Sequence, residues 1–301
     1  MRHYFILNPA AGKRDRSPEF RQIIEAVCGG KGLDYEISVS QAPGHCKALA
    51  AQAAAKGESC RIYACGGDGT LNEIVNGIVG LPNAAVTHFP GGSGNDFIKI
   101  FRDTAPFSDL ERLLDPEEAE FDLIACGKDY ALNICSIGLD ARIGTDIGKY
   151  KRLPLVSGPG SYILSTLVNV AHKIHEHYVI DLDGAHFDGE KTLICVANGR
   201  HYGGSFYPVP EADPTDGLLD VLLVAPVNVF QVAGVIGKYK AGQYRKYPNL
   251  IHHYTCRSLT IRCDAPTPVN LDGELRLSRE IQMSVAREKL RFFYPRGLAF
   301  K

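Results

Sequence analysis

The sequence has no excess of charge of either sign and no long uninterrupted apolar run. Its 33 basic and 34 acidic side chains leave a formal net charge of -1, so it lacks the broad positive field on which non-specific nucleic-acid binders depend. The longest apolar region, residues 218–237, is interrupted by Asp220, Pro226 and Asn228, which favours a strand, a turn and a helix over a membrane span. We therefore expect no nucleic-acid partner and no transmembrane segment.

Paired cysteines are also lacking. The nine cysteines are odd in number and none form a Cys-x-x-Cys pair, which argues against a disulfide framework and against a structural zinc site. Most lie in apolar runs, where a free cysteine packs as a small hydrophobic residue. We expect a reducing, cytoplasmic setting, and 301 residues are enough for two domains.

The first chemical signal is a strand, a glycine-rich turn and a helix within residues 61–79. Residues 61–65 are apolar enough for a buried strand, and apolar side chains between 71 and 79 recur with the spacing of one helix face. Between them lies the run Gly-Gly-Asp-Gly-Thr at 66–70. Unpaired N–H groups at a helix start, with the close backbone approach that glycine permits, suit a phosphate.

Three polar side chains refine this prediction. Thr70 and Glu73 have the spacing of a capping box, which places the helix start at Thr70. Asp68 would repel a bare phosphate, so its carboxylate indicates an intervening Mg²⁺ ion. The alternative is a tight strand-to-helix turn in which Thr70 is an ordinary cap.

Two further loops follow predicted strands. Residues 8–13 (Asn-Pro-Ala-Ala-Gly-Lys) follow a strand at 4–7, and residues 90–96 (Pro-Gly-Gly-Ser-Gly-Asn-Asp) follow a strand at 84–89. Three such loops alternating with helices predict a parallel sheet that binds a ligand at the carboxyl ends of its strands. None matches the Walker A or Gly-x-Gly-x-x-Gly spacing, so a dinucleotide oxidoreductase is disfavoured. For Lys13 alone, a solvated surface turn is an equal alternative.

The second half of the chain has the pattern of antiparallel β-structure. Hairpins are predicted at 122–137 and 178–196, with further strands at 218–224, 258–263, 280–286 and 290–294. Residues 161–175 have helical spacing. A separate, mainly β domain therefore begins near Glu120.

With these loops in place, the sequence resembles the diacylglycerol-kinase catalytic-domain family, particularly its soluble bacterial lipid kinases, with sphingosine kinases as more distant relatives. Residues 66–70 are identical to the family's Gly-Gly-Asp-Gly-Thr signature, and residues 8–13 and 90–97 are similar to its first and third nucleotide loops. Residues 271–274 (Leu-Asp-Gly-Glu) look like its catalytic motif. The resemblance covers almost the whole chain.

The resemblance implies two domains. Residues 1–120 are expected to form an α/β nucleotide-binding domain of the type shared with NAD kinases. Residues 121–289 are expected to form an antiparallel β-sandwich for the lipid substrate, and residues 290–301 to pack back on the first domain.

The resemblance also implies the nucleotide-binding residues. Ser93 stands where relatives usually have threonine, and the retained hydroxyl is expected to keep the role. The expected ATP-binding residues are Asn8, Pro9, Gly12, Lys13, Ser40, Gly66, Gly67, Asp68, Gly69, Thr70, Gly92, Ser93, Gly94 and Asn95.

Catalytic and metal-binding roles follow in the same way. Asp68 is expected to orient catalytic Mg²⁺, and Asp272 or Glu274 to accept the proton of the lipid hydroxyl; which of the two is the base stays open. On an extended strand, two carboxylates that flank a glycine point to one face, whereas Asp-Gly alone is equally typical of a hairpin turn. A structural Mg²⁺ site is expected from Asp213, Asp216 and the carbonyl of Leu218.

The resulting hypothesis is an ATP- and Mg²⁺-dependent lipid kinase that converts diacylglycerol to phosphatidic acid, cytoplasmic and peripheral at the inner face of the membrane. The alternatives are an NAD-kinase-like enzyme and a non-catalytic nucleotide- or lipid-binding module. Residues 238–247 interleave basic and aromatic side chains, as interfacial segments do, although a solvated helix end has the same composition. The oligomeric state stays open, with a homodimer as one alternative.

Overall fold

The structure is a computed structural model of the chain, and it describes residues 1–139, 141–142, 175–204 and 206–300. The chain divides into two compact units. The first unit comprises Met1–Leu123 and Ala286–Lys301, and the second unit comprises Ile124–Val285. The predicted helix at 161–175 lies outside the described residues, apart from its last residue.

The first unit is built on a six-stranded sheet with the order β2-β1-β3-β4-β16-β5. β1, β2, β3 and β4 pair in parallel, β16 is parallel to β4, and β5 is antiparallel to β16. The central strands are apolar on both faces, as expected for a parallel sheet covered on both sides. The strands are β1 (Arg2–Leu7), β2 (Tyr35–Val39), β3 (Cys60–Gly66), β4 (Ala84–Pro90), β5 (Pro116–Phe121) and β16 (Leu290–Pro295).

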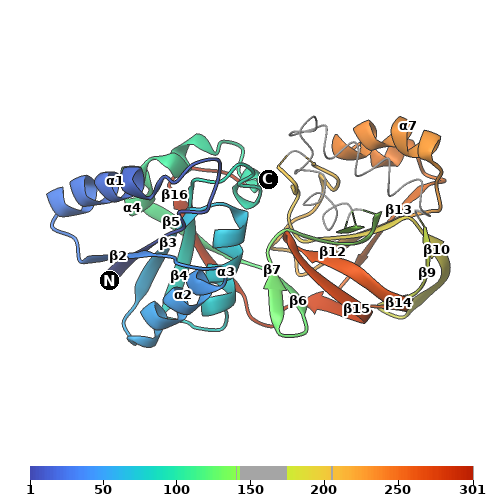
Figure 1. Cartoon of the computed structure of the whole chain (residues 1–301), viewed down its shortest axis with the longest axis horizontal. Helices are drawn as coiled ribbons and strands as arrows, with labels where there is room; N and C mark the ends of the chain where they lie inside the picture. The colour runs from blue at the N-terminus through green and yellow to red at the C-terminus, as the bar shows by residue number, and fades with distance from the viewer. Residues whose placement is uncertain (140, 143–174, 205, 301) are drawn as a thin grey trace. The chain divides into compact units, whose positions relative to one another are not determined.

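Helices cover both faces of this sheet (Figure 1). α1 contacts α4, and α2 contacts α3, and the two pairs lie on opposite faces. The helices are α1 (Ser17–Gly30), α2 (His45–Ala55), α3 (Asp68–Ile78) and α4 (Leu110–Leu114), with short 3₁₀ turns η1 (Phe97–Ile100) and η2 (Ala105–Ser108).

Strand β16 brings an aromatic cluster against the segment that follows β4. Phe292 is fully buried, and its ring centroid lies 5.1 Å from that of Phe97 and 5.8 Å from that of Phe121. Aromatic pairs at these separations bury large apolar areas in defined geometry. Phe97 directly follows the third glycine-rich loop, so this cluster anchors one end of that loop.

The second unit is a ten-stranded, mainly antiparallel sheet with the order β13-β12-β11-β8-β14-β15-β6-β7, to which β9 and β10 are joined through β14. Strand β14 pairs with β9 near its start and with β8 near its end, and its register with β15 shifts between Arg262 and Thr267. The strands are β6 (Ile124–Cys126), β7 (Asp129–Ala131), β8 (Ile134–Gly138), β9 (Glu176–Leu182), β10 (Ala185–Lys191), β11 (Leu193–Ala197), β12 (Leu219–Val224), β13 (Ile251–Cys256), β14 (Ser258–Leu271) and β15 (Glu274–Val285).

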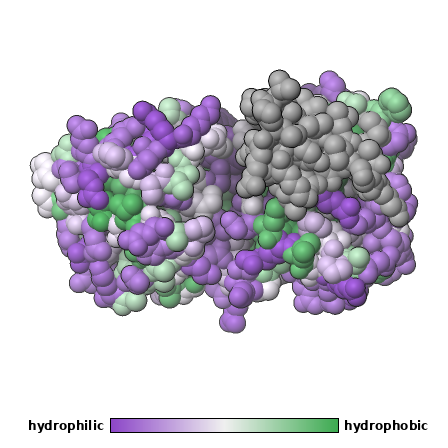
Figure 2. All heavy atoms as spheres, viewed as in Figure 1, coloured by the Kyte–Doolittle hydropathy of each residue, from purple (hydrophilic) through white to green (hydrophobic). Residues whose placement is uncertain are grey.

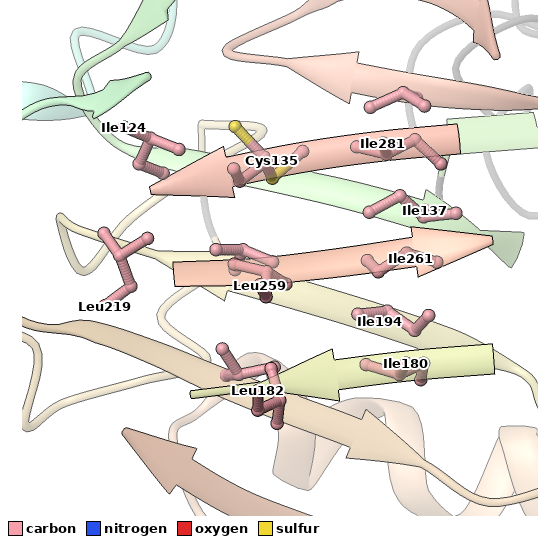
Figure 3. Close-up of a cluster of buried hydrophobic side chains, with 14 of the residues drawn as sticks. Ile124, Cys135, Ile137, Ile180, Leu182, Ile194, Leu219, Leu259, Ile261 and Ile281 are labelled. Carbon is pink, nitrogen blue, oxygen red and sulfur yellow. The ribbon is translucent and has the colours of Figure 1, made fainter. Parts of the chain in front are cut away.

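Strands β11 and β12 are buried on both faces because each face packs against a different cluster. Ile194 and Val196 join the main core, to which most strands of the unit contribute (Figure 3), whereas Leu193 and Cys195 face a second cluster. Alternate residues of a strand point to opposite faces, which explains the split. The second cluster packs against helix α7 (Val229–Lys240) and the turn η3 (Tyr244–Lys246).

The predicted fold class, an α/β unit followed by an antiparallel β-sandwich, is confirmed. The start of α3 differs from the prediction: the helix begins at Asp68 with Gly67 as an extended N-cap, so Thr70 lies inside its first turn. The capping-box interpretation was wrong because both side chains bond elsewhere. Thr70 accepts from Asn8, and Glu73 accepts from the N–H groups of Gly44 and Cys46 at the start of α2.

Candidate active site

The three glycine-rich loops of the first unit meet at one edge of the sheet. They follow β1, β3 and β4, which are neighbours in the strand order, so the carboxyl ends of these strands bring the loops together. Asn8 joins the first loop to the second: its N–H donates to the Cys65 carbonyl (3.0 Å), and its side-chain amide donates to the Thr70 hydroxyl (2.9 Å).

The carbonyl of Gly66 joins the second loop to the third. It accepts hydrogen bonds from the N–H groups of Gly91 (2.7 Å) and Gly92 (3.1 Å) and from Nε2 of His88 (2.8 Å). Burial lowers the pKa of His88, so its ring is neutral near pH 7 and Nε2 carries the donated proton. Three donors on one carbonyl fix the relative position of the two loops.

Glycine is required where these loops touch. A Cβ atom on Gly92 would lie 2.4 Å from the Cα of Gly67, and one on Gly12 would lie 2.6 Å from the Gly91 carbonyl oxygen. Gly12 also has a φ of 79°, in the left-handed region that glycine adopts without strain. At these two contacts the loops are therefore packed backbone against backbone, with no room for a side chain.

The N-terminus of α3 is left without a side-chain cap. In the part of the chain that the structure describes, the backbone N–H groups of residues 68–70 have no hydrogen-bond acceptor. Such groups, with the positive end of the helix dipole, form an anion-binding position. The glycines on either side let a phosphate approach the backbone closely.

Asp68 is the charged group at this position. Its carboxylate accepts hydrogen bonds from the backbone N–H groups of Asp96 and Phe97, so it also organises the third loop. Burial raises the pKa of Asp68, and the nearby Asp96 carboxylate raises it further. A partly buried carboxylate in this state fits a divalent cation, because the added positive charge stabilises its ionised form.

The other predicted nucleotide-binding residues lie on the same loops or on the neighbouring strand. Ser40 follows β2; it is buried, its N–H donates to the Leu7 carbonyl (2.8 Å), and its hydroxyl donates to the Ala42 carbonyl (3.2 Å). Asn95 has a φ of 51° and closes the third loop through two 3.1 Å hydrogen bonds between its side chain and the backbone of Gly92. Lys13, Gly69 and Ser93 are exposed on their loops. Pro9 is half-buried, and Gly94 lies beside the Asp68 carboxylate.

The sequence reasoning missed two residues of this site. His88 is fully buried and holds the Gly66 carbonyl; the signal that could have found it is a titratable side chain inside an otherwise apolar strand just before a glycine-rich loop. Asp96 is also buried and pairs with the Lys99 ammonium at 2.5 Å. Both residues shape the loops rather than reaching outward.

In the second unit, Asp272 and Glu274 lie at the turn between β14 and β15. Asp272 has a φ of 50° and Gly273 one of 100°, so the motif is a tight hairpin turn. The expectation of an extended strand with both carboxylates on one face was wrong, because two consecutive left-handed residues reverse the chain here.

The two carboxylates have different surroundings. Asp272 accepts hydrogen bonds from three consecutive backbone N–H groups, those of Leu132, Asn133 and Ile134, and its Oδ1 lies 2.9 Å from the Ile134 nitrogen. Glu274 is exposed, and among the described residues its carboxylate has neither a hydrogen bond nor an ion pair. Asp272 thus holds the turn in place, and Glu274 is the carboxylate free to accept a proton.

The residues expected to hold a structural metal lie on one turn before β12. Asp213 accepts from the N–H (3.1 Å) and hydroxyl (2.6 Å) of Thr215, and Asp216 accepts from the N–H of Leu218 (2.9 Å). Two carboxylates and a carbonyl are the oxygen donors that Mg²⁺ prefers. Among the described residues, no three His, Cys, Asp or Glu side chains gather as a metal site.

A cavity of about 60 Å³ lies between the outer face of β11–β13 and helix α7 in the second unit. Its lining is almost wholly apolar and includes Leu193, Val224 and Ile251 from the strands, and Val232, Ile236 and Tyr239 from the helix. Concave sites with such a lining bind apolar ligands or the apolar part of an amphipathic one.

Comparison with protein families gives two matches that together span most of the chain. Residues 2–126 match the model of the diacylglycerol kinase catalytic domain. Residues 133–293, more than half of the chain, match the model of the YegS C-terminal NAD kinase beta sandwich-like domain.

Individual relatives agree with these matches. A Staphylococcus carnosus protein named "Putative lipid kinase" is 25% identical to this chain over an alignment that covers 77% of this chain and 76% of the relative. A Staphylococcus haemolyticus protein, also named as a putative lipid kinase, is 27% identical over 76% of this chain and 74% of the relative. A crystal structure titled as a diacylglycerol kinase from Bacillus anthracis superposes with a TM-score of 0.72 at 20% identity, covering 99% of this chain and 98% of that one. The structural likeness establishes the common fold.

Proposed function

We propose that this chain, which is a kinase and belongs to the diacylglycerol-kinase catalytic-domain family, transfers the γ-phosphoryl group of ATP to the free hydroxyl of diacylglycerol. The observation that carries this proposal is the joining of three glycine-rich loops around the uncapped start of α3. Phosphoryl transfer depends on positioning and charge neutralisation more than on covalent chemistry, and this arrangement supplies a rigid anion-binding position.

The first unit is proposed to bind the nucleotide phosphates. The N–H groups of residues 68–70 would donate to phosphate oxygens, and the exposed Lys13 and Ser93 are placed on loops from which they can add a charge and a hydroxyl. Asn8 and His88 act indirectly, because each holds one loop against another. The loops are thus positioned before the ligand arrives.

Asp68 is the proposed ligand for Mg²⁺, directly or through a bound water. A magnesium ion at this position would neutralise charge on the phosphoryl group. Asp68 is suited to the role because it is partly buried, and the attraction between a carboxylate and a cation is stronger where water is partly excluded than at an exposed site. A second, structural Mg²⁺ is proposed at Asp213 and Asp216, with the carbonyl of Leu218 as a further donor.

Glu274 is the proposed general base. Its exposed carboxylate has no competing partner among the described residues, so it is available to accept the proton of an acceptor hydroxyl. Asp272 is a positioning residue: its hydrogen bonds to Leu132, Asn133 and Ile134 hold the turn that presents Glu274.

The apolar cavity of the second unit supports a lipid acceptor. Its lining is apolar and therefore suits a segment of an acyl chain better than a nucleoside or a sugar, which need several polar partners. Diacylglycerol is proposed as the acceptor because it combines apolar chains with one primary hydroxyl. Its phosphorylation would make the protein an enzyme of phospholipid metabolism that contacts the membrane peripherally.

The test is phosphorylation of a lipid panel by the full-length protein. Mixed micelles that contain diacylglycerol, monoacylglycerol, ceramide, sphingosine or undecaprenol would be incubated with Mg²⁺ and γ-labelled ATP, with soluble NAD as a further acceptor. We expect labelled phosphatidic acid from the wild type, about 10²-fold less or lower still from Glu274→Gln, and wild-type amounts from Glu280→Gln, an exposed glutamate on the same strand.

Other outcomes correct defined parts of the proposal. Label in another lipid would retain the kinase and replace diacylglycerol by that acceptor. Label in NAD alone would refute the lipid acceptor and favour an NAD-kinase-like activity. Product formed equally by Glu274→Gln would refute Glu274 as the base.

A further inference from the structure

Helix α7 lies at the surface of the second unit and forms one wall of the apolar cavity. Its start is fixed by a capping box: the N–H of Gln231 donates to the Asn228 side chain (3.0 Å), and the N–H of Asn228 donates to the Gln231 side chain (2.9 Å). Its inner face is apolar and lines the cavity with Val232, Val235, Ile236 and Tyr239.

The outer face of α7 is apolar as well. Phe230 is 86% exposed, the largest exposed fraction of any large apolar side chain in the described chain. Ala233, Gly234 and Gly237 are also exposed, and the helix has no charged residue before Lys238. Figure 2 shows apolar atoms at the outer margin of the second unit, where Figure 1 labels α7. A surface helix ordinarily carries charged side chains on its outer face, so this helix lacks the pattern of a purely solvated one.

Positive charge lies at the C-terminal end of this apolar face. Residues 221–263 contain no aspartate or glutamate, although the chain has 34 acidic residues, and they contain six lysines and arginines. Lys238 and Lys240 are exposed in the last turn of α7, and Lys240 lies over the Phe206 ring at 5.5 Å. Arg245, just beyond the helix, pairs with Glu211 at 3.0 Å.

Two of the three aromatic residues that interleave with these cations are buried, and the third, Tyr247, is half-buried. Tyr239 and Tyr244 are only 4% and 1% exposed and belong to the cluster beneath α7. Lysines in a last helical turn are common because they complement the helix dipole, so they alone would indicate nothing more. The helix dipole does not explain why Phe230 is exposed on an uncharged segment of nine residues, 229–237.

We infer that α7 docks on an anionic bilayer surface, with the Phe230 ring inserted below the headgroups and Lys238 and Lys240 at the level of the lipid phosphates. Twelve residues of helix span about 18 Å, too short for a bilayer core of about 30 Å. The helix therefore lies in the plane of the interface. The inference rests on the proposed function in one respect. Because the proposed acceptor is a membrane lipid, the helix that forms one wall of the apolar cavity, α7, is the element expected to contact the membrane.

The test uses the absence of tryptophan from the natural sequence. Phe230→Trp places a single reporter on the docking face, and Leu277→Trp places the same reporter at a 72% exposed leucine on β15. Each full-length protein is titrated with phosphatidylcholine vesicles that contain phosphatidylglycerol, without ATP or diacylglycerol. We expect a shift of Trp emission to shorter wavelength for position 230 and none for position 277.

Cosedimentation with the same vesicles gives the affinity. Phe230→Glu should weaken binding by roughly 30-fold, because it removes the burial of one large apolar side chain. Lys238→Ala combined with Lys240→Ala should weaken it by roughly 10- to 30-fold. Leu277→Glu should leave it unchanged. Equal weakening by Phe230→Glu and Leu277→Glu, or no vesicle binding by the wild type, would overturn the inference.

Two further readouts separate this inference from its alternatives. If the wild type sediments in the ultracentrifuge as a dimer that Phe230→Glu converts to a monomer, and vesicles do not bind, the face joins two copies of the chain and the docking inference is overturned. Phosphorylation of a short-chain, water-dispersed diacylglycerol should be unaffected by Phe230→Glu. Vesicle binding through Phe230 without any lipid product would retain docking and refute the proposed kinase acceptor.

Discussion

The second glycine-rich loop of the first unit, residues 66–70, and the turn at residues 272–274 of the second unit are both short motifs at a strand end. They are held in different ways. The first is fixed by backbone contacts with two other loops, and a Cβ atom on Gly66 or Gly67 would lie 2.3 Å from the Thr70 hydroxyl or 3.1 Å from the Gly92 Cα. The second is fixed by two side chains: the Asp272 carboxylate accepts from three backbone N–H groups, and the Asn270 side chain accepts from the N–H of Gly273 (2.6 Å). The Cβ position of Gly273 meets open space.

Because the two motifs are held in place differently, the residues that hold each motif can be distinguished from the groups that are available to a ligand. In the first unit, almost every residue of the loops contributes to their shape, and the chemistry is left to bare N–H groups and Asp68. In the second unit, the Asp272 carboxylate holds the turn, and the Glu274 carboxylate is the proposed proton acceptor. Substitutions should therefore affect stability and activity together in the first unit and separately in the second.

The largest effect is expected at Glu274. Glu274→Gln removes a proton acceptor without removing volume, so kcat should fall by about 10²- to 10⁴-fold while the apparent affinity for ATP and the Tm stay unchanged. Steady-state kinetics and thermal unfolding measure the two parts. If Glu274→Gln lowered the Tm as much as a substitution of Asp272 does, Glu274 would also hold the turn, and the separate roles of the two carboxylates would be contradicted.

The next largest effect is expected at Asp272. Asp272→Ala leaves three backbone N–H groups without their charged acceptor and places alanine at a positive φ, so the free energy of unfolding should fall by about 3 kcal/mol or more. Asp272→Asn tolerates the turn conformation and should lose roughly half as much. Urea unfolding of both variants provides the measurement, and an unchanged midpoint for both would show that Asp272 does not hold the turn.

In the first unit, Gly92→Ala should be destabilising in the absence of any ligand. The added Cβ would lie 2.4 Å from the Gly67 Cα, and such overpacking typically costs about 1 to 3 kcal/mol. Gly69→Ala is the matched control, because it lies in the neighbouring motif and its Cβ meets no atom within 4 Å. Equal urea midpoints for the two nucleotide-free variants would argue against close packing of the loops.

The smallest effect is expected at Asp68. Its pKa is raised in the folded chain, so the fold binds this proton more tightly than the unfolded chain does, and the contribution of Asp68 to stability decreases as the pH rises above about 4. Asp68→Asn should therefore raise the Tm of the ligand-free protein at pH 7 by about 1 to 3 °C.

The same variant should lose the additional thermal stabilisation that Mg²⁺ gives to the ATP complex. Thermal unfolding at pH 5 and pH 7, with ATP alone and with ATP and Mg²⁺, tests both statements. A variant less stable than the wild type at pH 7 would show that the hydrogen bonds of Asp68 outweigh the cost of its burial.

The fold was largely predictable because its signals are local. Apolar periodicity marks the helices, alternation marks the strands, and glycine-rich loops after successive strands indicate a parallel sheet. The start of α3 was misplaced because the partners of Thr70 and Glu73 are Asn8, Gly44 and Cys46, which lie far away in the sequence.

The candidate site was predictable in its residue types and less so in its geometry. His88 was missed because its role depends on a carbonyl 22 residues away, which no local pattern reveals. The turn at Asp272 was misinterpreted because Asp-Gly allows both conformations, and the choice is made by the N–H groups of residues 132–134. Side chains that act across the fold leave no periodic signal in the sequence.

Phosphoryl transfer to diacylglycerol is tested most directly by ³¹P NMR of a reaction that contains the full-length protein, MgATP and diacylglycerol in detergent micelles. We expect ADP and phosphatidic acid to accumulate in equal amounts, without inorganic phosphate. ADP accompanied only by inorganic phosphate, or ATP that stays intact while every acceptor of the panel is present, would contradict the proposed phosphoryl transfer.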